Sequence, residues 1–480
     1  MEMKRLAGLE PAAVFSYFEE ICAIPHGSRN TKMISDYLVA FAKQHDLKYI
    51  QDADHNVILF GEGTCGMEDH APVILQGHMD MVCEKDADCS IDMAVDGLDI
   101  AHDGSFVFAK GTTLGADNGI ALALAMAILA DKTIPHPPLE VIITTDEEIG
   151  LLGAASVDLS ALKGRTLINL DSEGEGVFTV SCAGGCTATI SLPVERRAVY
   201  GPCIRLVVDS LQGGHSGGDI HLNRGNANKI MGEFMSRIQK IMPLCLTSLA
   251  GGAKDNAIPR SCQATLVAMG IHLERINDIA QQLQDEVREN YNEPEAVIQA
   301  FDVDALGGNS LSTESTAKII GLLCAAPNSV QTWSKDIEGL VQTSLNMGVI
   351  KLGERFSATF SVRSSVNSEK IELLEQLKML ADMFDGSYSE MGAYPAWEYK
   401  KESHLRDVMV ETYRNLFGKE PKVEAIHAGL ECGLFSEKIP NLDCISIGPQ
   451  MYDVHTSRER LSIASTERTW TFLLEVLKNL

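Results

Sequence analysis

Hydrophobic residues along the first 171 positions follow two spacings. Stretches with apolar residues three to four positions apart predict helices, and short apolar runs rich in β-branched residues predict buried strands. Strands separated by helices are typical of an α/β fold, in which helices cover a sheet. The predicted helices cover residues 10–22, 31–43 and 120–129, and the predicted strands cover residues 73–75, 139–145 and 166–170.

The pattern changes from about residue 187. Apolar and polar residues alternate over 204–208 and 356–362, which predicts strands with one buried face, and amphipathic helices are expected over 223–240 and 273–290. Short strands return later, and we expect the one over 444–447 to rejoin the first sheet. The predicted organisation is a first domain in two parts, residues 1–186 and 398–480, with an α+β domain, residues 187–397, inserted between them.

The charge and composition of the chain argue against nucleic acid and membranes as binding partners. The 480-residue chain has 40 Lys and Arg residues against 66 Asp and Glu residues, a formal net charge of −26 at pH 7. Such a chain repels polyanions, whereas binding to nucleic acid or anionic membranes depends on Lys and Arg. No apolar stretch is long enough to span a bilayer, and the twelve cysteines lack the regular spacing of a disulfide framework. We therefore expect a cytoplasmic protein with reduced thiols that binds neither nucleic acid nor membranes.

Polar residues follow the predicted strands, at the edge where open α/β sheets bind ligands. His78 and Asp80 come just after the strand that begins at Val73. One intervening residue on an extended segment points both side chains to the same side. The imidazole can then bind a metal while the carboxylate orients it through its other nitrogen. The alternative is a surface histidine that lies near an acid.

Carboxylates follow the next two strands. Asp146, Glu147 and Glu148 are adjacent and repel one another, a conflict resolved if one binds a cation and another acts as a general base. Asp171 follows the strand over 166–170 in the same way.

Two more residues complete the candidate set. Asp117 lies between glycines just before an apolar helix, where the alternative role is a helix N-cap, and His455 stands near Asp453 late in the chain. Two histidines with three or more carboxylates fit a site for two divalent cations in which one carboxylate bridges the metals. Mixed imidazole and oxygen ligands suit zinc and tolerate manganese or cobalt.

These motifs resemble a known family. The string Gly-Thr-Thr-Leu-Gly-Ala-Asp-Asn-Gly over 111–119 is far more specific than His-x-Asp, and it is joined by the segments 182–185 and 427–433. Over nearly its whole length the chain resembles the co-catalytic zinc exopeptidases of the carboxypeptidase/aminoacylase type, and among them the aminoacyl-histidine dipeptidases. The resemblance implies a zinc-exopeptidase-like mixed sheet flanked by helices, with the inserted α+β domain as a lid.

The resemblance also implies the activity and the roles of the residues. The activity would be metal-dependent hydrolysis of Xaa-His dipeptides, such as β-Ala-His, with two divalent cations, Zn²⁺ or in its place Co²⁺ or Mn²⁺. His78 and Asp171 would hold one metal, Glu148 and His455 the other, and Asp117 would bridge them, while Glu147 would be the general base and Asp80 would orient His78.

Four further residues are candidates for binding the substrate. His215 lies in a glycine-rich segment, either as a solvated turn residue or, by resemblance, as the group that stabilises the oxyanion. Asn256 lies in a loop that resembles the family's Asn-containing lid loop. Arg363 ends an alternating strand, where it either grips a substrate carboxylate in a bidentate manner or is a surface arginine. Gly429 is expected to shape the substrate end of the pocket.

Other activities use the same ligand set. A related di-zinc aminoacylase or deacylase, or an exopeptidase of broader specificity, is the alternative, because specificity depends on pocket contacts. A non-catalytic metal- or peptide-binding protein would lack the base that Glu147 supplies. Lids of this family often dimerise so that the partner supplies the histidine. We expect a homodimer, and the sequence leaves open whether His215 acts within its own chain.

Overall fold

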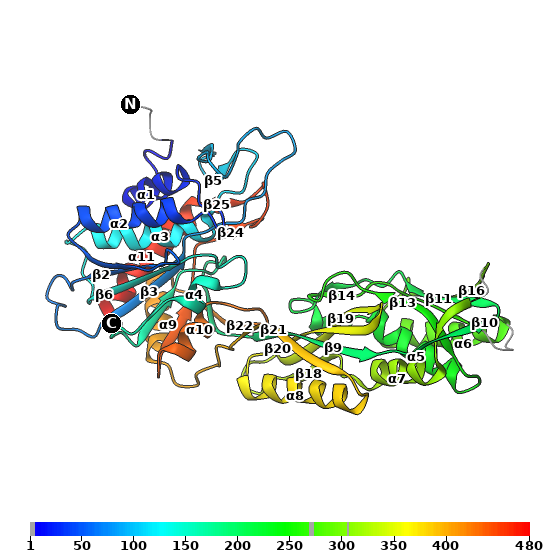
Figure 1. Ribbon diagram of the computed structural model, residues 1–480. Coiled ribbons are helices and arrows are strands. Elements are labelled where there is room, and N and C mark those ends of the chain that lie inside the picture. The colour runs from blue at the N-terminus through cyan, green and yellow to red at the C-terminus, as the bar shows by residue number, and fades with distance from the viewer. Residues whose placement is uncertain (1–4, 268–272, 305–306) are drawn as a thin grey trace. The chain divides into compact units, whose positions relative to one another are not determined.

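The computed structural model describes residues 5–267, 273–304 and 307–480, which form two compact units (Figure 1). The first unit comprises Met1–Ser181, Tyr399–Ala425 and Leu430–Leu480, and the second comprises Cys182–Glu398 and Ile426–Gly429. The sequence places the domain boundaries at 186/187 and 397/398, whereas the chain leaves the first unit after Ser181 and returns to it at Tyr399. The second unit also takes the short segment 426–429, which no sequence pattern marks.

The first unit is built on an eight-stranded mixed sheet with the order β1-β2-β6-β3-β7-β23-β8-β22. Its central strands β6, β3, β7 and β23 are parallel, and they are apolar because both faces of such a sheet are covered. The strand expected to rejoin this sheet does so: β23 pairs with β7, with Cys444 opposite Leu167. The sheet strands are β1 (Lys48–Gln51), β2 (Val57–Gly61), β3 (Val73–His78), β6 (Leu139–Thr144), β7 (Thr166–Asn169), β8 (Val177–Cys182), β22 (Lys422–Ile426) and β23 (Asp443–Ser446).

Helices cover this sheet, which confirms the α/β prediction. α1, α2 and α3 lie together on one side of β2, β6 and β3 (Figure 1). α3 is hydrophobic around its whole circumference, as expected for a helix packed between α1 and β3. Near β8, Phe178 stacks on Phe472 of α11, and Tyr413 of α9 meets both rings edge-on. The helices are α1 (Ala12–Cys22), α2 (Lys32–Gln44), α3 (Ala116–Ala130), α4 (Leu152–Ser156), α9 (His404–Phe417), α10 (Cys432–Lys438) and α11 (Ile463–Asn479).

A small four-stranded sheet, ordered β24-β25-β5-β4, completes the first unit. β24 and β25 form an antiparallel hairpin in which Met451 faces Leu461, and β25 pairs in turn with β5. The loop of this hairpin therefore has a fixed base. The four strands are β4 (Ile100–His102), β5 (Phe106–Ala109), β24 (Met451–Tyr452) and β25 (Arg460–Ser462).

The second unit is an antiparallel sheet with helices along one side (Figure 1). Its main path runs β16-β11-β15-β13-β19-β20-β9-β21, and β18 pairs with β19. The apolar residues that alternate along β20, from Phe356 to Val362, are buried in the core. The strands are β9 (Gly184–Pro193), β10 (Arg196–Tyr200), β11 (Cys203–Asp209), β12 (Gly214–His215), β13 (Cys245–Gly251), β14 (Ala257–Ile258), β15 (Cys262–Val267), β16 (Val297–Val303), β17 (Gly307–Leu311), β18 (Ser329–Trp333), β19 (Val341–Leu352), β20 (Arg355–Ser364) and β21 (Ser387–Tyr394).

Two helices of the second unit match the two expected amphipathic segments, with one boundary difference, and the other two, over 313–325 and 367–383, were not predicted. The helix predicted over 223–240 begins later, because Asn226 acts as the N-cap and its side chain accepts hydrogen bonds from the backbone N–H groups of Asn228 and Lys229. In the part of the chain that the structure describes, no helix combines the length and the apolar character needed to cross a membrane. The helices are α5 (Ala227–Gln239), α6 (Leu273–Asn290), α7 (Thr313–Ala325) and α8 (Asn367–Met383).

Candidate metal centre

The predicted metal ligands meet at the carboxyl ends of the parallel strands. His78 is the last residue of β3, Glu148 follows the end of β6, and Asp171 follows the end of β7. Asp117 lies in the first turn of α3, and His455 lies in the loop between β24 and β25. This edge of a parallel sheet is where such folds bind ligands, since the strand ends leave a crevice between the loops.

The five side chains form two groups that share Asp117. Asp117 Oδ1 lies 3.1 Å from His78 Nε2, and Asp117 Oδ2 lies 3.1 Å from His455 Nε2. Asp171 Oδ1 lies 3.4 Å from the same nitrogen of His78, and Glu148 Oε1 lies 2.9 Å from that of His455. The N-cap of α3 is Gly115, so the N-cap role considered for Asp117 is excluded. Each group offers one imidazole and two carboxylate oxygens, a donor set that suits a divalent cation.

The spacing of the donor atoms fits a metal ion. One ligand atom from each of His78, Asp117 and Glu148 lies within 4.8 Å of the other two. His78 is 1% exposed, whereas the side chain of His455 is 49% exposed, so one position is buried and the other is open to solvent. An open position leaves room for water or a substrate beside the cation.

The two histidines of the site hold their protons tightly because carboxylates surround them. Hydrogen bonds to Asp117 and Glu148 raise the pKa of His455 to about 10. Burial alone would lower the pKa of His78, but the charge of Asp171 and hydrogen bonds to carboxylates outweigh it, and this pKa is raised well above its ordinary value. The pKa of Asp117 is lowered despite its burial, because both histidines donate to it. A bound cation would replace these protons as the positive charge of the site.

Glu147 lies beside the two groups without belonging to either. Its Oε2 is 4.0 Å from His78 Nε2, farther than the carboxylate oxygens that face that nitrogen. Burial raises the pKa of Glu147 to about 9, with the charges of Asp171 and nearby glutamates acting in the same direction. Cations bound nearby would lower this pKa and favour the ionised form. A carboxylate in this position can take a proton from a water at the metals.

Asp80 connects His78 with the segment that carries Glu147. His78 Nδ1 lies 3.0 Å from the backbone oxygen of Asp80 and 3.4 Å from its Oδ1. The carboxylate also accepts hydrogen bonds from the backbone N–H of Glu147, at 3.0 Å, and from the hydroxyl of Ser28, at 2.8 Å. Asp80 thus restrains the backbone at Glu147 and the hydroxyl of Ser28 as well as the imidazole of His78. Sequence reasoning missed Ser28, which no motif near it indicates.

A second polar cluster contains the substrate-binding candidates and belongs to the second unit. His215 Nδ1 accepts hydrogen bonds from the backbone N–H groups of Gly217 and Gly218, at 3.2 and 3.0 Å. The proton of the neutral imidazole is therefore on Nε2, which is available as a donor. Burial and the charge of Arg363 lower the pKa of His215, which favours this neutral form. The backbone oxygen of Asn256 accepts from Ser216 N–H at 2.9 Å, next to His215.

Arg363 and Gly429 belong to the same cluster. A Cβ atom on Gly217 would lie 3.2 Å from both Arg363 Nε and His215 Cε1, so these two side chains meet around that glycine. Arg363 Nη1 is 3.4 Å from the hydroxyl of Tyr394, while its buried Nε has no hydrogen-bond partner among the described residues. A Cβ atom on Gly429 would lie 2.7 Å from the Tyr394 ring, so a side chain there would displace the ring.

The sequence analysis gave no role to His427, although this residue begins the segment 427–433, which contributes to the family resemblance. Its Nε2 is 2.7 Å from the Ser344 hydroxyl, and a Cβ atom on Gly217 would lie 2.6 Å from its backbone oxygen. Burial and the charge of Arg363 lower its pKa to about 3, so this imidazole is neutral. His427 therefore adds a second uncharged imidazole beside Arg363.

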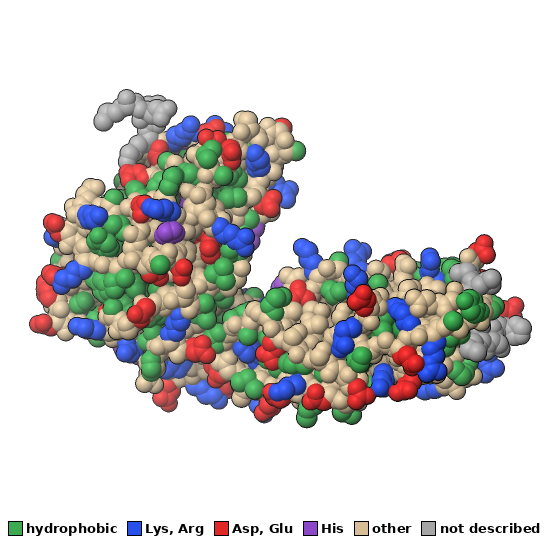
Figure 2. All heavy atoms as spheres, viewed as in Figure 1, with side chains coloured by type: hydrophobic (Ala, Val, Ile, Leu, Met, Phe, Trp, Pro, Cys, Tyr) green, Lys and Arg blue, Asp and Glu red, His purple; other side chains and the backbone are tan. Residues whose placement is uncertain are grey.

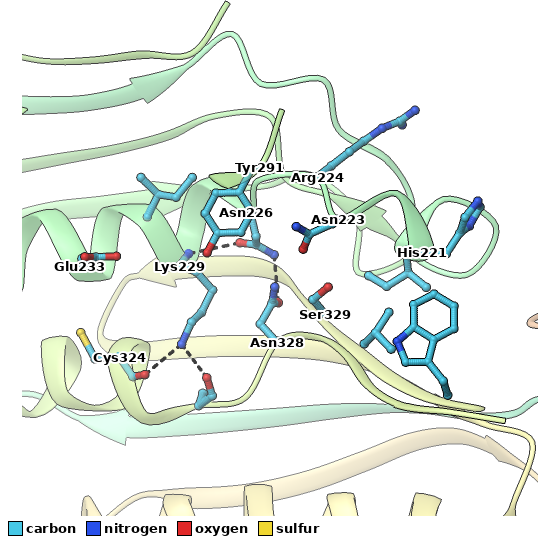
Figure 3. A pocket seen from close by; sticks show the side chains of 15 residues that line it. His221, Asn223, Arg224, Asn226, Lys229, Glu233, Tyr291, Cys324, Asn328 and Ser329 are labelled. Atoms are coloured by element: carbon cyan, nitrogen blue, oxygen red, sulfur yellow. Dashed lines mark hydrogen bonds between the residues drawn. The ribbon is translucent and has the colours of Figure 1, made fainter. Parts of the chain in front are cut away.

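A separate cavity of about 790 Å³ lies in the second unit, near the start of α5 and the end of α7 (Figure 3). Lys229 donates to the backbone oxygens of Leu323, Cys324 and Ala326 at the end of α7. Asn226 donates to Asn328 in the same wall. None of the predicted site residues lines this cavity, and its charged lysine is engaged within the protein.

Acidic and basic side chains are both present on the face of the molecule that Figure 2 shows. The two kinds are interspersed over this face. Together with the net charge of −26, this distribution agrees with a small-molecule site at the sheet edge.

Two histidines and three carboxylates meet at the carboxyl edge of the parallel strands, with a fourth carboxylate beside them, an arrangement typical of a metal-dependent hydrolase. The chain matches the family described as peptidase family M20/M25/M40 over residues 74–479, a range that includes every predicted metal ligand. The chain belongs to this family and is a peptidase. This result confirms the resemblance drawn from the motifs.

Individual relatives cover the whole chain. It is 37% identical over 483 residues to the cytosol non-specific dipeptidase of Escherichia coli (strain K12), covering 100% of this chain and 99% of the relative. The crystal structure of aminoacylhistidine dipeptidase from Vibrio alginolyticus is 34% identical, has a TM-score of 0.94 and covers 99% of this chain and 98% of that chain. Aminopeptidase PepT from Bacillus cereus shares the fold, with a TM-score of 0.56 at 14% identity over 98% of each chain.

Proposed function

We propose that the protein is a dipeptidase that hydrolyses Xaa-His dipeptides such as β-Ala-His. The observation that carries the proposal is Asp117, whose two oxygens each face a histidine that has a carboxylate of its own. The Vibrio alginolyticus relative, named for aminoacylhistidine substrates, supports the preference for histidine. The Escherichia coli relative is named a non-specific dipeptidase, which supports a broader range of dipeptides as the second candidate.

The site would hold two divalent cations, Zn²⁺ or in its place Co²⁺ or Mn²⁺. When bound, they would lower the pKa of a water to about 7 and polarise the peptide carbonyl. Glu147 takes a proton from the attacking water and returns it to the leaving amine. Asp80 keeps the backbone of Glu147 and the imidazole of His78 in place for this transfer. The ligands would be His78, Asp171, Asp117, Glu148 and His455, with Asp117 shared.

The second cluster would recognise the rest of the substrate. His215 would donate its Nε2–H to the oxyanion that develops on the carbonyl. Arg363 would hold the terminal carboxylate of the dipeptide, with Asn256 as a further hydrogen-bonding group. Gly429 would keep the pocket open beside Tyr394. We propose a homodimer. A cytoplasmic location is supported by the name of the Escherichia coli relative.

Turnover of four substrates by zinc-loaded protein tests the proposal: β-Ala-His, Gly-His, Gly-Leu and N-acetyl-His. We expect metal-dependent cleavage of the two histidine dipeptides with a free amine, and no cleavage of N-acetyl-His. Equal cleavage of Gly-Leu would indicate the broader dipeptidase, and preference for N-acetyl-His would indicate a deacylase. No cleavage in both the zinc-loaded and the metal-stripped protein would contradict a peptidase role for this site.

Arg363→Ala is expected to raise KM for Gly-His by about 10- to 100-fold, because a charge-assisted hydrogen bond contributes about 1.5–3 kcal/mol. Gly-His amide, which lacks the terminal carboxylate, should be affected much less. Arg355→Ala is the matched control, since Arg355 is an exposed arginine on the same strand that bonds Ser191. Steady-state kinetics of the three proteins on both substrates give the comparison. An equal loss on the amide would refute recognition of the carboxylate.

A further inference from the structure

Glu459 is a buried carboxylate that bonds the segment around Asp117. It is 2% exposed, and its Oε2 accepts hydrogen bonds from the backbone N–H groups of Leu114 and Gly115, at 2.8 and 3.1 Å. Its Oε1 accepts from those of Ala116 and Asp117, at 2.8 and 3.4 Å. Four consecutive backbone donors thus converge on one side chain. These include N–H groups at the start of α3, which have no partner within the helix.

The conformation of this segment depends on a glycine. Gly115 has φ 66°, a left-handed conformation that glycine adopts without a steric penalty. A Cβ atom there would lie 2.8 Å from Met81 Sδ, so the backbone also passes close to a neighbouring side chain. The chain can therefore turn its N–H groups inward onto the Glu459 carboxylate.

Glu459 lies in the same hairpin loop as His455. The loop joins β24 and β25, and Glu459 closes a turn within it by donating its backbone N–H to the Thr456 oxygen at 3.1 Å. The side chain of Glu459 holds the start of α3, while His455 reaches Asp117 in the same region. The hairpin loop thus contacts the α3 segment twice, once through a metal-ligand pair and once through a carboxylate and four N–H groups.

We propose that Glu459 is a positioning residue for the candidate metal centre, which fixes Asp117 against His455 so that Asp117 can be shared between two cations. The proposal rests on the proposed function only in assuming that this site binds metal. A buried carboxylate costs free energy unless hydrogen bonds satisfy it, and here four donors do so. Outer partners of metal ligands typically change metal affinity by about 10- to 100-fold.

Glu459→Gln tests the role with little change of shape. The amide places an N–H₂ group against backbone donors, which removes acceptors and adds repulsion. Titration of metal-free protein with Co²⁺ alone gives the affinity, and the visible absorption of bound Co²⁺ reports the geometry of its ligands. We expect Co²⁺ binding to weaken by about 10- to 100-fold, with a changed visible spectrum.

Glu140→Gln is the matched control. Glu140 is 5% exposed and accepts the backbone N–H groups of Lys163 and Gly164, at 2.8 and 2.9 Å, in the same unit but away from the predicted ligands. This variant should lose thermal stability while keeping the affinity and spectrum of Co²⁺. Wild-type Co²⁺ affinity and spectrum in Glu459→Gln, or an equal loss in Glu140→Gln, would overturn the proposal.

Glu459→Asp covers the case in which the glutamine variant does not fold. It keeps the charge but shortens the side chain by one methylene, and we expect Co²⁺ affinity between those of the wild type and the glutamine variant. An affinity equal to that of Glu140→Gln would count against the positioning role. Failure of wild-type protein to bind Co²⁺ would instead contradict the metal centre itself, so the two hypotheses fail in different ways.

Discussion

Glu147→Gln is expected to lower kcat by about 10²- to 10⁴-fold, while the protein still binds its metal ions. Glutamine has the shape of glutamate but cannot take a proton from water. The nearest histidine nitrogen is 4.0 Å from Glu147, so the change leaves the short contacts between the predicted ligands intact. Initial rates on the best-cleaved dipeptide, with elemental analysis of bound metal, measure both quantities. Normal turnover with normal metal content would refute the role of general base.

The neighbouring carboxylate provides the contrasting control. Glu148 lies 2.9 Å from His455 Nε2 and is a predicted ligand. Glu148→Gln should therefore lose bound metal, whereas Glu147→Gln should keep it. This difference in metal content between the two variants would identify Glu147 as the general base and Glu148 as a metal ligand. If both variants keep their metal and their turnover, neither assignment stands.

Removal of the metal has the other large expected effect. Chelation should lower turnover by about 10³-fold or more, because a bound cation contributes several kcal/mol to stabilising the transition state. Zn²⁺, Co²⁺ or Mn²⁺ added after removal of the chelator should restore activity. Full turnover by protein shown to be free of metal would contradict a metal-dependent mechanism.

Metal rebinding should depend on pH with a defined sign. The pKa of His455 is raised to about 10 in the metal-free site, so its imidazole is protonated at pH 7 and a cation must displace that proton. Apparent affinity should therefore rise as pH increases from 6 to 8, by up to about tenfold per unit for each proton displaced. Calorimetry in two buffers of different ionisation enthalpy would count the protons released.

The sequence predicted those parts of the site that depend on local pattern. His78, Glu148 and Asp171 each stand at or just after the end of a strand that apolar runs identify, and parallel pairing brings those ends together. The position of Asp117 between two imidazoles could not be predicted in this way. It depends on His455, which reaches the site because β25 pairs with β5 at a distant point in the chain.

Residues whose side chains accept hydrogen bonds from backbone N–H groups could not be predicted from the sequence, for a different reason. Glu459 bonds four main-chain N–H groups, and main-chain donors carry no side-chain signal in a sequence. Its place four residues after His455 was the only local indication. Asn226 is a second example. Its side chain caps the backbone N–H groups of α5, so the helix begins at Ala227 and not at residue 223, where the hydrophobic pattern placed it.

The order of strands in the first sheet has a consequence for the newly made chain. β23 lies between β7 and β8, yet its residues are translated long after both, with a delay of roughly 15–55 s at typical synthesis rates. During that interval the edge of β7 has unpaired backbone groups, the kind of edge to which other chains can add. His78, Asp117 and Asp171 have then left the ribosome, whereas His455 has not been synthesised. Glu459, which bonds the segment around Asp117, is made later still, so the groups around Asp117 are complete only after the C-terminal hairpin has been synthesised.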